Sequence, residues 1–94
     1  MPRPRSRRRV REFPGVTYYK PQGVPLRQLQ SEILSHEEWE SLRLRYDENL
    51  DQHNIAKKMQ TSQSSVQRIL SGAQRKMASA IIQGKAIKIH TEKT

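Results

Sequence analysis

The sequence of 94 residues contains no cysteine, which excludes disulfide bridges and thiolate metal sites and is typical of a reducing compartment. Aromatic residues are also scarce, with one Trp, three Tyr and one Phe, so we expect no platform of stacking rings for single-stranded nucleic acid. Hydrophobic runs extend over only a few residues, so neither a membrane-spanning segment nor a secretory signal is expected. These absences predict a small cytoplasmic protein.

Candidates for catalysis and metal binding are equally few. The three histidines, His36, His53 and His90, lack the spacing of metal ligands, and the sequence has no glycine-rich loop for binding phosphate. The adjacent Glu37 and Glu38 are better interpreted as first-turn residues that complement a helix dipole. We therefore predict no catalytic residue, no metal and no cofactor, and expect that the protein is not an enzyme.

The formal net charge of +9 at pH 7 is unevenly distributed. Residues 1–30 contain eight basic residues and one acid, and residues 55–94 have the same balance. Residues 31–54 contain seven acids against two arginines. Such segregation favours a polyanionic partner, a nucleic acid, over a generic soluble surface.

Residues 52–71, QHNIAKKMQTSQSSVQRILS, predict two short helices joined by a tight turn, the helix-turn-helix arrangement. The apolar positions with helical spacing are Ile55, Ala56 and Met59 in the first helix and Val66, Ile69 and Leu70 in the second. Asp51 and Ser62 are predicted to be the N-caps of these helices. Gln60 falls in the turn, where the backbone tends to be left-handed and Gly is usual, at a cost of about 1 kcal/mol.

The second helix of this unit is predicted to read base edges in the DNA major groove. Its outward side chains are short, polar and free of acid, and amide and guanidinium groups can form paired hydrogen bonds to adenine and guanine. The predicted base-facing residues are Gln63, Ser64, Gln67, Arg68 and Ser71. The predicted contacts to the DNA backbone or minor groove are Arg3, Arg5, Arg7, Arg8, Arg9, Arg11, Gln52, Lys57, Ser62 and Arg75. The alternative is an ordinary helical hairpin whose polar face is only solvated.

The N-terminal third is predicted to contain little regular structure. Residues 1–15 form an arginine-rich flexible arm that Pro2 and Pro4 keep extended, and this arm either contacts DNA or is only a solubilising tail. Residues 16–20 predict a short strand, since they are β-branched and aromatic between turn residues. Residues 26–34 have the spacing of a short helix, so 16–34 is interpreted as a strand followed by a linker or short helix.

Residues 35–90 are predicted to form the helix-turn-helix domain, with helices at about 35–47, 51–59 and 62–83. Residues 91–94 are predicted to form a tail. Ser35 and Glu38 have the spacing of a capping box, and Trp39 is expected to anchor the core. Gly84 should end the long third helix, and residues 86–90 predict a terminal strand. The predicted fold is mainly α, with a minor two-stranded β element formed by this strand and residues 16–20, or by the same segment of another chain.

Beyond the two-helix unit the apolar stripe of the long helix continues through Ala73, Met77, Ala80 and Ile81. This stripe must either pack back on Trp39 or meet a second subunit. A homodimer is therefore one expectation, and a monomer with a folded-back helix is the other.

Several segments also resemble a known family. These are the opening MPRPRxxRRV, the segment VTYYKPQGVPLRQL, the Trp-bearing helix with L-R-L, the N-L-D-Q…AxKM…S…VQRIL core and the closing GKAIKI. They resemble a small prokaryotic family of uncharacterised, predicted DNA-binding proteins, whose core is similar to the promoter-binding helix-turn-helix domain of sigma factors. The resemblance implies Gln63, Ser64, Gln67 and Arg68 as base-facing residues and makes the transcription machinery a candidate partner. Members often have cysteines in the arm and Gly in the turn, where this sequence has Arg7, Arg11 and Gln60.

The sequence thus predicts a sequence-specific protein that binds double-stranded DNA, a transcriptional regulator located in the cytoplasm at the nucleoid. One alternative is an RNA-binding or ribosome-associated basic protein, although the RNA major groove is too narrow for a helix. The other alternative is a protein-docking module that uses the acidic helix of residues 37–48.

Overall fold

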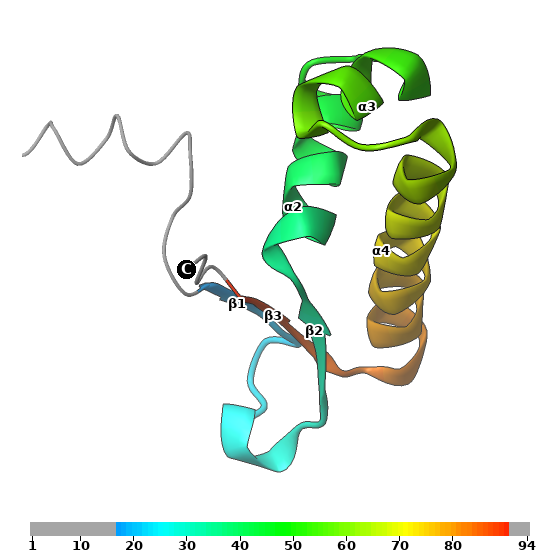
Figure 1. Cartoon of the computed structure of the whole chain (residues 1–94). Helices are drawn as coiled ribbons and strands as arrows, with labels where there is room; N and C mark the ends of the chain where they lie inside the picture. Colours follow the sequence, from blue (N-terminus) through cyan, green and yellow to red (C-terminus); the bar gives the residue numbers. More distant parts are fainter. Residues whose placement is uncertain (1–16, 91–94) are drawn as a thin grey trace, which may run out of the picture.

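The computed structural model describes residues 17–90, which form a mainly helical chain with a small sheet (Figure 1). The elements are β1 (Thr17–Tyr19), a 3-10 turn η1 (Leu26–Gln28), β2 (Ser31–Leu34), α2 (His36–Leu42), a π-helical turn η2 (Arg43–Asp47), α3 (Gln52–Met59), α4 (Gln63–Gln83) and β3 (Ala86–Ile89). Helices α2 and α4 pack side by side above the sheet, and α3 lies at their opposite end (Figure 1). The predicted fold class, mainly α with a minor β element, is confirmed.

The sheet has one more strand than expected, because residues 26–34 do not form a helix. Only Leu26–Gln28 make a single 3-10 turn, and Ser31–Leu34 form β2. Within β2 the side chains alternate between the two faces of the sheet, with Leu34 only 2% exposed and Ile33 50% exposed. The spacing of Leu26, Leu29 and Ile33 therefore coincides with a helical period without producing a helix.

Strand β3 lies at the centre of the sheet, in the order β1-β3-β2. It pairs with β1 antiparallel, with Tyr19 opposite Ile87, and with β2 parallel, with Leu34 opposite Ile89. Both edges of β3 are therefore hydrogen-bonded within one chain. The terminal strand needs no partner from a second copy.

The helix that begins after Ser35 starts as predicted but does not continue as a single α-helix to Asp47. The capping box is confirmed, since the Glu38 N–H donates to Ser35 Oγ at 3.1 Å and the Ser35 N–H donates to Glu38 Oε1 at 2.9 Å. From Arg43 the backbone widens into η2, and the Glu48 N–H donates to the Arg43 carbonyl five residues earlier at 3.1 Å. Leu44, in this wide turn, is buried in the core.

The core consists of two clusters arranged along α4. At the α3 end, the buried residues are Leu44, Ile55, Ala56, Val66 and Leu70. At the sheet end, Leu34, Ala73 and Ile89 are buried. Trp39 packs against this second cluster, as expected of a core residue, but its side chain is half-buried and not fully buried.

Candidate nucleic-acid interface

The turn between α3 and α4 spans residues 60–62 and depends on one left-handed residue. Gln60 has φ 60° and ψ 48°, and its N–H donates to the last carbonyls of α3. Gly is usual in such a conformation because it has no Cβ to clash. The left-handed backbone expected at this position is confirmed, and it lets the chain reverse into α4 within three residues.

Both helices of this unit begin at side-chain caps, as predicted. Asp51 Oδ1 accepts from the Asn54 N–H at 2.9 Å, and Ser62 Oγ accepts from the Ser65 N–H at 3.1 Å. Each cap satisfies one of the first-turn amides that a helix leaves unpaired. The start of α4 is thus fixed relative to the turn before any partner binds.

All five residues predicted to face bases are exposed on α4: Gln63, Ser64, Gln67, Arg68 and Ser71. Ser64, Arg68 and Ser71 lie on the side of α4 opposite Val66 and Leu70, which are buried against α3 and η2, whereas Gln63 and Gln67 flank the buried side. Ser64, Arg68, Ser71 and Arg75 recur at intervals of three and four residues and therefore share one side of the helix. This polar ridge begins at the turn and runs along the first three turns of α4.

Side-chain contacts hold residues at the start of α4. One joins the hydroxyls of Ser62 and Ser64 at 3.2 Å, and two others involve residues that sequence reasoning did not select. Gln63 Nε2 lies 3.1 Å from His53 Nδ1, at the start of α3. Arg68 Nη2 donates to Ser65 Oγ at 3.2 Å. The position of Ser65, one turn before Arg68, could have indicated the contact with Arg68, whereas the contact with His53 depends on how α3 and α4 cross.

The residues predicted to contact the DNA backbone are only partly placed by the structure. Lys57, Ser62 and Arg75 are exposed around the ridge, and Gln52 is half-buried at the first position of α3. The hydroxyl of Ser62 is engaged in capping. The six predicted arm residues, Arg3, Arg5, Arg7, Arg8, Arg9 and Arg11, lie outside the described residues.

Charge on the described surface is separated between α3–α4 and α2–η2. Residues 52–83 contain five Lys or Arg residues and no acid. On α2–η2, Arg43 bridges Glu40 at 2.9 Å and Glu48 at 2.6 Å, and the hydrogen bond that it donates to the Glu40 carboxylate is the main cause that raises the pKa of Arg43. Glu38 is paired with Lys76 of α4 at 2.9 Å. Three carboxylates of residues 37–48 are therefore paired within the chain with two cations, Arg43 and Lys76.

A second ionic contact fixes the end of α4 to the sheet. Glu32 of β2 accepts from Lys85 at 2.9 Å and from Ser79 at 3.0 Å. The hydrogen bond from Lys85, followed by that from Ser79, lowers the pKa of the Glu32 carboxyl below its usual value of 4.5. This contact lies at the far end of α4 from the polar ridge.

Within residues 17–90, no group of three or more His, Asp or Glu side chains is placed to hold a metal ion. Over the same residues, no helix has the length and apolar character needed to cross a bilayer.

The fold and the exposed ridge define a small basic helical domain, and comparison with known proteins places it in a family. The model of the family described as "Protein of unknown function DUF134" matches residues 1–93. A "UPF0251 protein" of Moorella thermoacetica is 47% identical over 89 residues, which cover 95% of this chain and 60% of that protein. Similar relatives of the same name occur in Pelotomaculum thermopropionicum, with 45% identity over 95% of this chain and 67% of the relative, and in Dehalococcoides mccartyi, with 46% identity over 95% and 76%.

This chain belongs to the DUF134, or UPF0251, family of prokaryotic proteins, and the family resemblance predicted from its sequence is confirmed. The chain spans 60% of the length of the Moorella relative and 67% of the Pelotomaculum relative. No solved structure matches it.

Proposed function

We propose that this protein binds double-stranded DNA in a sequence-specific manner and acts as a transcriptional regulator at the nucleoid. In this proposal α3 and α4 form a helix-turn-helix unit similar to that of sigma factors, and the start of α4 enters the major groove. The arginine-rich segment of residues 3–11 contacts phosphates or the minor groove. The transcription machinery is the candidate protein partner of such a regulator.

One observation carries the proposal: the polar ridge of α4 is exposed, acid-free and positioned by a capped turn. The guanidinium of Arg68 donates through Nη2 to Ser65 Oγ, which reduces the rotamer freedom that the side chain would lose on binding a guanine. Five cations and no acid on residues 52–83 would attract phosphates on both sides of the groove. A helical hairpin whose polar face is only solvated would not require both an acid-free ridge and an excess of cations around it.

The ion pairs of α2–η2 favour DNA binding over the docking alternative. A protein-docking helix would use its carboxylates for a partner, but Glu38, Glu40 and Glu48 already have cationic partners within the chain. If these carboxylates bound a partner instead, the ion pairs that join this helix to α4 and stabilise η2 would be broken. The acidic segment is better interpreted as part of the scaffold that supports the ridge.

The test is selection of a binding site from random duplex DNA, followed by titration of that site and of a scrambled duplex. Arg68→Ala should weaken binding to the selected site by about 1–3 kcal/mol and change binding to the scrambled duplex much less. Arg27→Ala is the matched control, since it removes the same charge from exposed η1, at the opposite end of the molecule from α3 (Figure 1).

Equal losses for both Arg68→Ala and Arg27→Ala, or equal losses on both duplexes, would contradict base readout by α4. Tighter binding to an RNA duplex of the selected sequence than to the DNA would favour the RNA-binding alternative, since a helix cannot enter the RNA major groove.

A further inference from the structure

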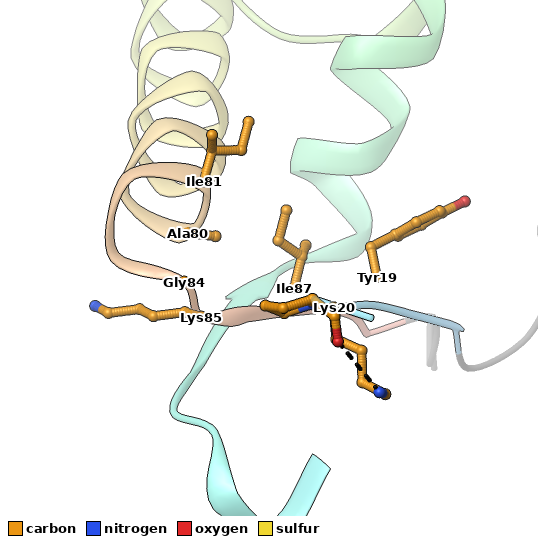
Figure 2. Close-up of a pocket in the computed structure, with 8 residues that line it drawn as sticks. Tyr19, Lys20, Ala80, Ile81, Gly84, Lys85 and Ile87 are labelled. Atoms are coloured by element: carbon orange, nitrogen blue, oxygen red, sulfur yellow. Dashed lines mark hydrogen bonds between the residues drawn. The ribbon is translucent and has the colours of Figure 1, made fainter. Parts of the chain in front are cut away.

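An apolar groove runs along the sheet end of the molecule, far from the polar ridge. Its floor is the sheet, and its walls are α2–η2 and the last turns of α4, which enclose about 690 Å³. The residues that give it its character are Tyr19, Trp39, Leu42, Met77, Ile81 and Ile87. A second hollow of about 280 Å³ continues it towards the end of α4, with Tyr19, Ile81 and Ile87 common to both (Figure 2).

The groove is open because the described part of the chain does not fill it. Among the strands, α4 packs mainly on β2, so the face of the sheet beside β1 is left with Tyr19 60% exposed. In Figure 2, Ile81 of α4 and Ile87 of β3 project into the space between the helix and the sheet. The sequence predicted that Ile81 would extend the buried stripe of α4, but it is 77% exposed.

Beside the groove, α4 carries a protruding apolar side chain. Ile82 is 79% exposed and points about 100° away from Ile81 around the helix, out of the groove. Two adjacent isoleucines exposed to this degree, next to an aromatic-lined groove, form a contiguous apolar patch of the kind that marks an interaction site. Charged residues line the groove only at its two ends, Arg43 and Asp47 at one and Lys20 and Lys85 at the other.

We propose that this groove is closed by a second copy of the same chain, in a two-fold symmetric homodimer. A two-fold contact uses the same patch on both subunits, so the patch must contain both a protrusion and a depression that receives it. Ile82 is the protrusion and the groove beside Ile81 is the depression. Each copy covers the groove of the other with the last turn of its α4.

The size and polarity of the patch fit a dimer interface. The two hollows are lined by eight and eleven residues, of which three are shared. Together with Ile82 this gives 17 residues, of which Leu34, Ala80 and Ile89 are buried in the core, so the patch is smaller than the roughly 20–30 residues per partner of a standard interface and fits a modest dimer contact. An apolar centre with charged ends is also the usual arrangement of such interfaces. The proposal does not depend on an unpaired terminal strand, because β3 is paired on both sides within its own chain.

One consequence rests on the proposed function. Ile82 lies 18 residues, or five turns, after Ser64 on the same side of α4, so a dimer joined at Ile82 holds the start of each polar ridge about 27 Å along the helix from the joint. Two ridges extending from a common joint can reach successive major grooves, which are about 34 Å apart on one face of the duplex. A dimer would therefore bind a palindromic site.

The experiment is sedimentation equilibrium of the full chain without DNA, from about 1 to 100 µM, the range in which a modest interface dissociates. The wild type should be a dimer, and Ile81→Glu or Ile82→Glu should raise its dissociation constant at least about tenfold, since a carboxylate would have to be buried in an apolar contact. Ile33→Glu is the matched control, because Ile33 is 50% exposed on the opposite face of the sheet and should leave the dimer intact. Circular dichroism establishes that each variant is folded.

The occupant of the groove is identified by intermolecular NOEs in a mixed sample of labelled and unlabelled chains. Contacts between the Ile82 methyl groups of one copy and Trp39 or Tyr19 of the other are expected. A wild-type monomer across the whole range overturns the proposal, as does a weakening of the dimer that is equal for Ile33→Glu and Ile82→Glu. A monomer in which Phe13 of the same chain contacts Ile81 would show instead that the N-terminal segment covers the groove. Because no DNA is present, a monomeric result would not contradict the proposed DNA binding. A failure to bind DNA would likewise not contradict the proposed dimer.

Discussion

Replacing Gln60 by Gly should stabilise the protein, although it removes a whole side chain. Gln60 ends α3 with φ 60° and ψ 48°, and its side chain is exposed. Within residues 17–90 that side chain makes no hydrogen bond, so its removal breaks none there. The backbone N–H of residue 60 would keep its bonds to the last carbonyls of α3 in the variant.

The size of the effect follows from two opposing contributions. The left-handed conformation costs a residue with a Cβ about 1–2 kcal/mol, and Gly avoids this cost. Gly also makes the unfolded chain more flexible, which lowers the free energy of unfolding by about 0.4–1 kcal/mol. We expect a net gain in the free energy of unfolding of about 0.5–1 kcal/mol, which corresponds to a rise in Tm of about 2–8 °C for a domain of this size.

The assay is thermal and urea unfolding at one fixed protein concentration, because self-association would make Tm depend on concentration. Gln67→Gly is the matched control, since it makes the same chemical change at an exposed position inside α4 and should lower the free energy of unfolding by about 0.5–1 kcal/mol. Asn49→Gly, at φ 58°, should gain less than Gln60→Gly because Asn tolerates the left-handed region better than Gln. If Gln60→Gly instead lowers Tm as Gln67→Gly does, residue 60 is not left-handed and the turn assigned between α3 and α4 is wrong.

Two further predictions concern pH and salt. Because the pKa of Glu32 is lowered by Lys85 and Ser79, its contribution to stability is present above its unfolded pKa near 4.5 and disappears as the pH falls through the lower folded value. Urea unfolding should therefore show Glu32→Gln to be less stable than the wild type at pH 7, with a smaller difference at acid pH; a difference independent of pH would refute the assignment. Deleting residues 1–11 should reduce the slope of log K against log salt for DNA binding by about 0.9 for each phosphate that the arm neutralises in the wild type, and an unchanged slope would show that it neutralises none.

The parts of the fold that were predicted correctly depend on local chemistry. The N-caps at Asp51 and Ser62 and the capping box at Ser35 join residues three positions apart, so their spacing is visible in the sequence. The ends of α3 and α4 were predictable for the same reason, since Gln60 and Gly84 lie where left-handed residues terminate helices. The outward direction of the polar ridge followed from the buried positions of Val66 and Leu70.

The parts that were missed depend on interactions between distant segments. Residues 31–34 form a strand because β3, more than fifty residues later, pairs with them, and four residues show no period long enough to reveal this. The π-helical turn at Arg43 is supported by Glu40 on one side and Glu48 on the other, whereas the sequence alone is equally compatible with a regular α-helix. Gly72 of α4 lies close to α2, since a Cβ there would lie 3.1 Å from Glu38 Oε2, and this contact between distant segments is not visible in the sequence.

The exposure of Ile81 was missed for a different reason, which also explains why α4 has two separate surfaces. A helical stripe is buried only where a neighbouring element lies against it, and along α4 the neighbours change from α3 and η2 to α2 and β2. Ala80 is buried, but Ile81, 100° further around the helix, faces the open groove beside Tyr19 and Ile87. The polar ridge and the apolar patch therefore occupy opposite ends of one rigid helix. Their separation is what allows the proposed DNA contact and the proposed dimer contact to be tested independently, by substitutions at Arg68 and at Ile82.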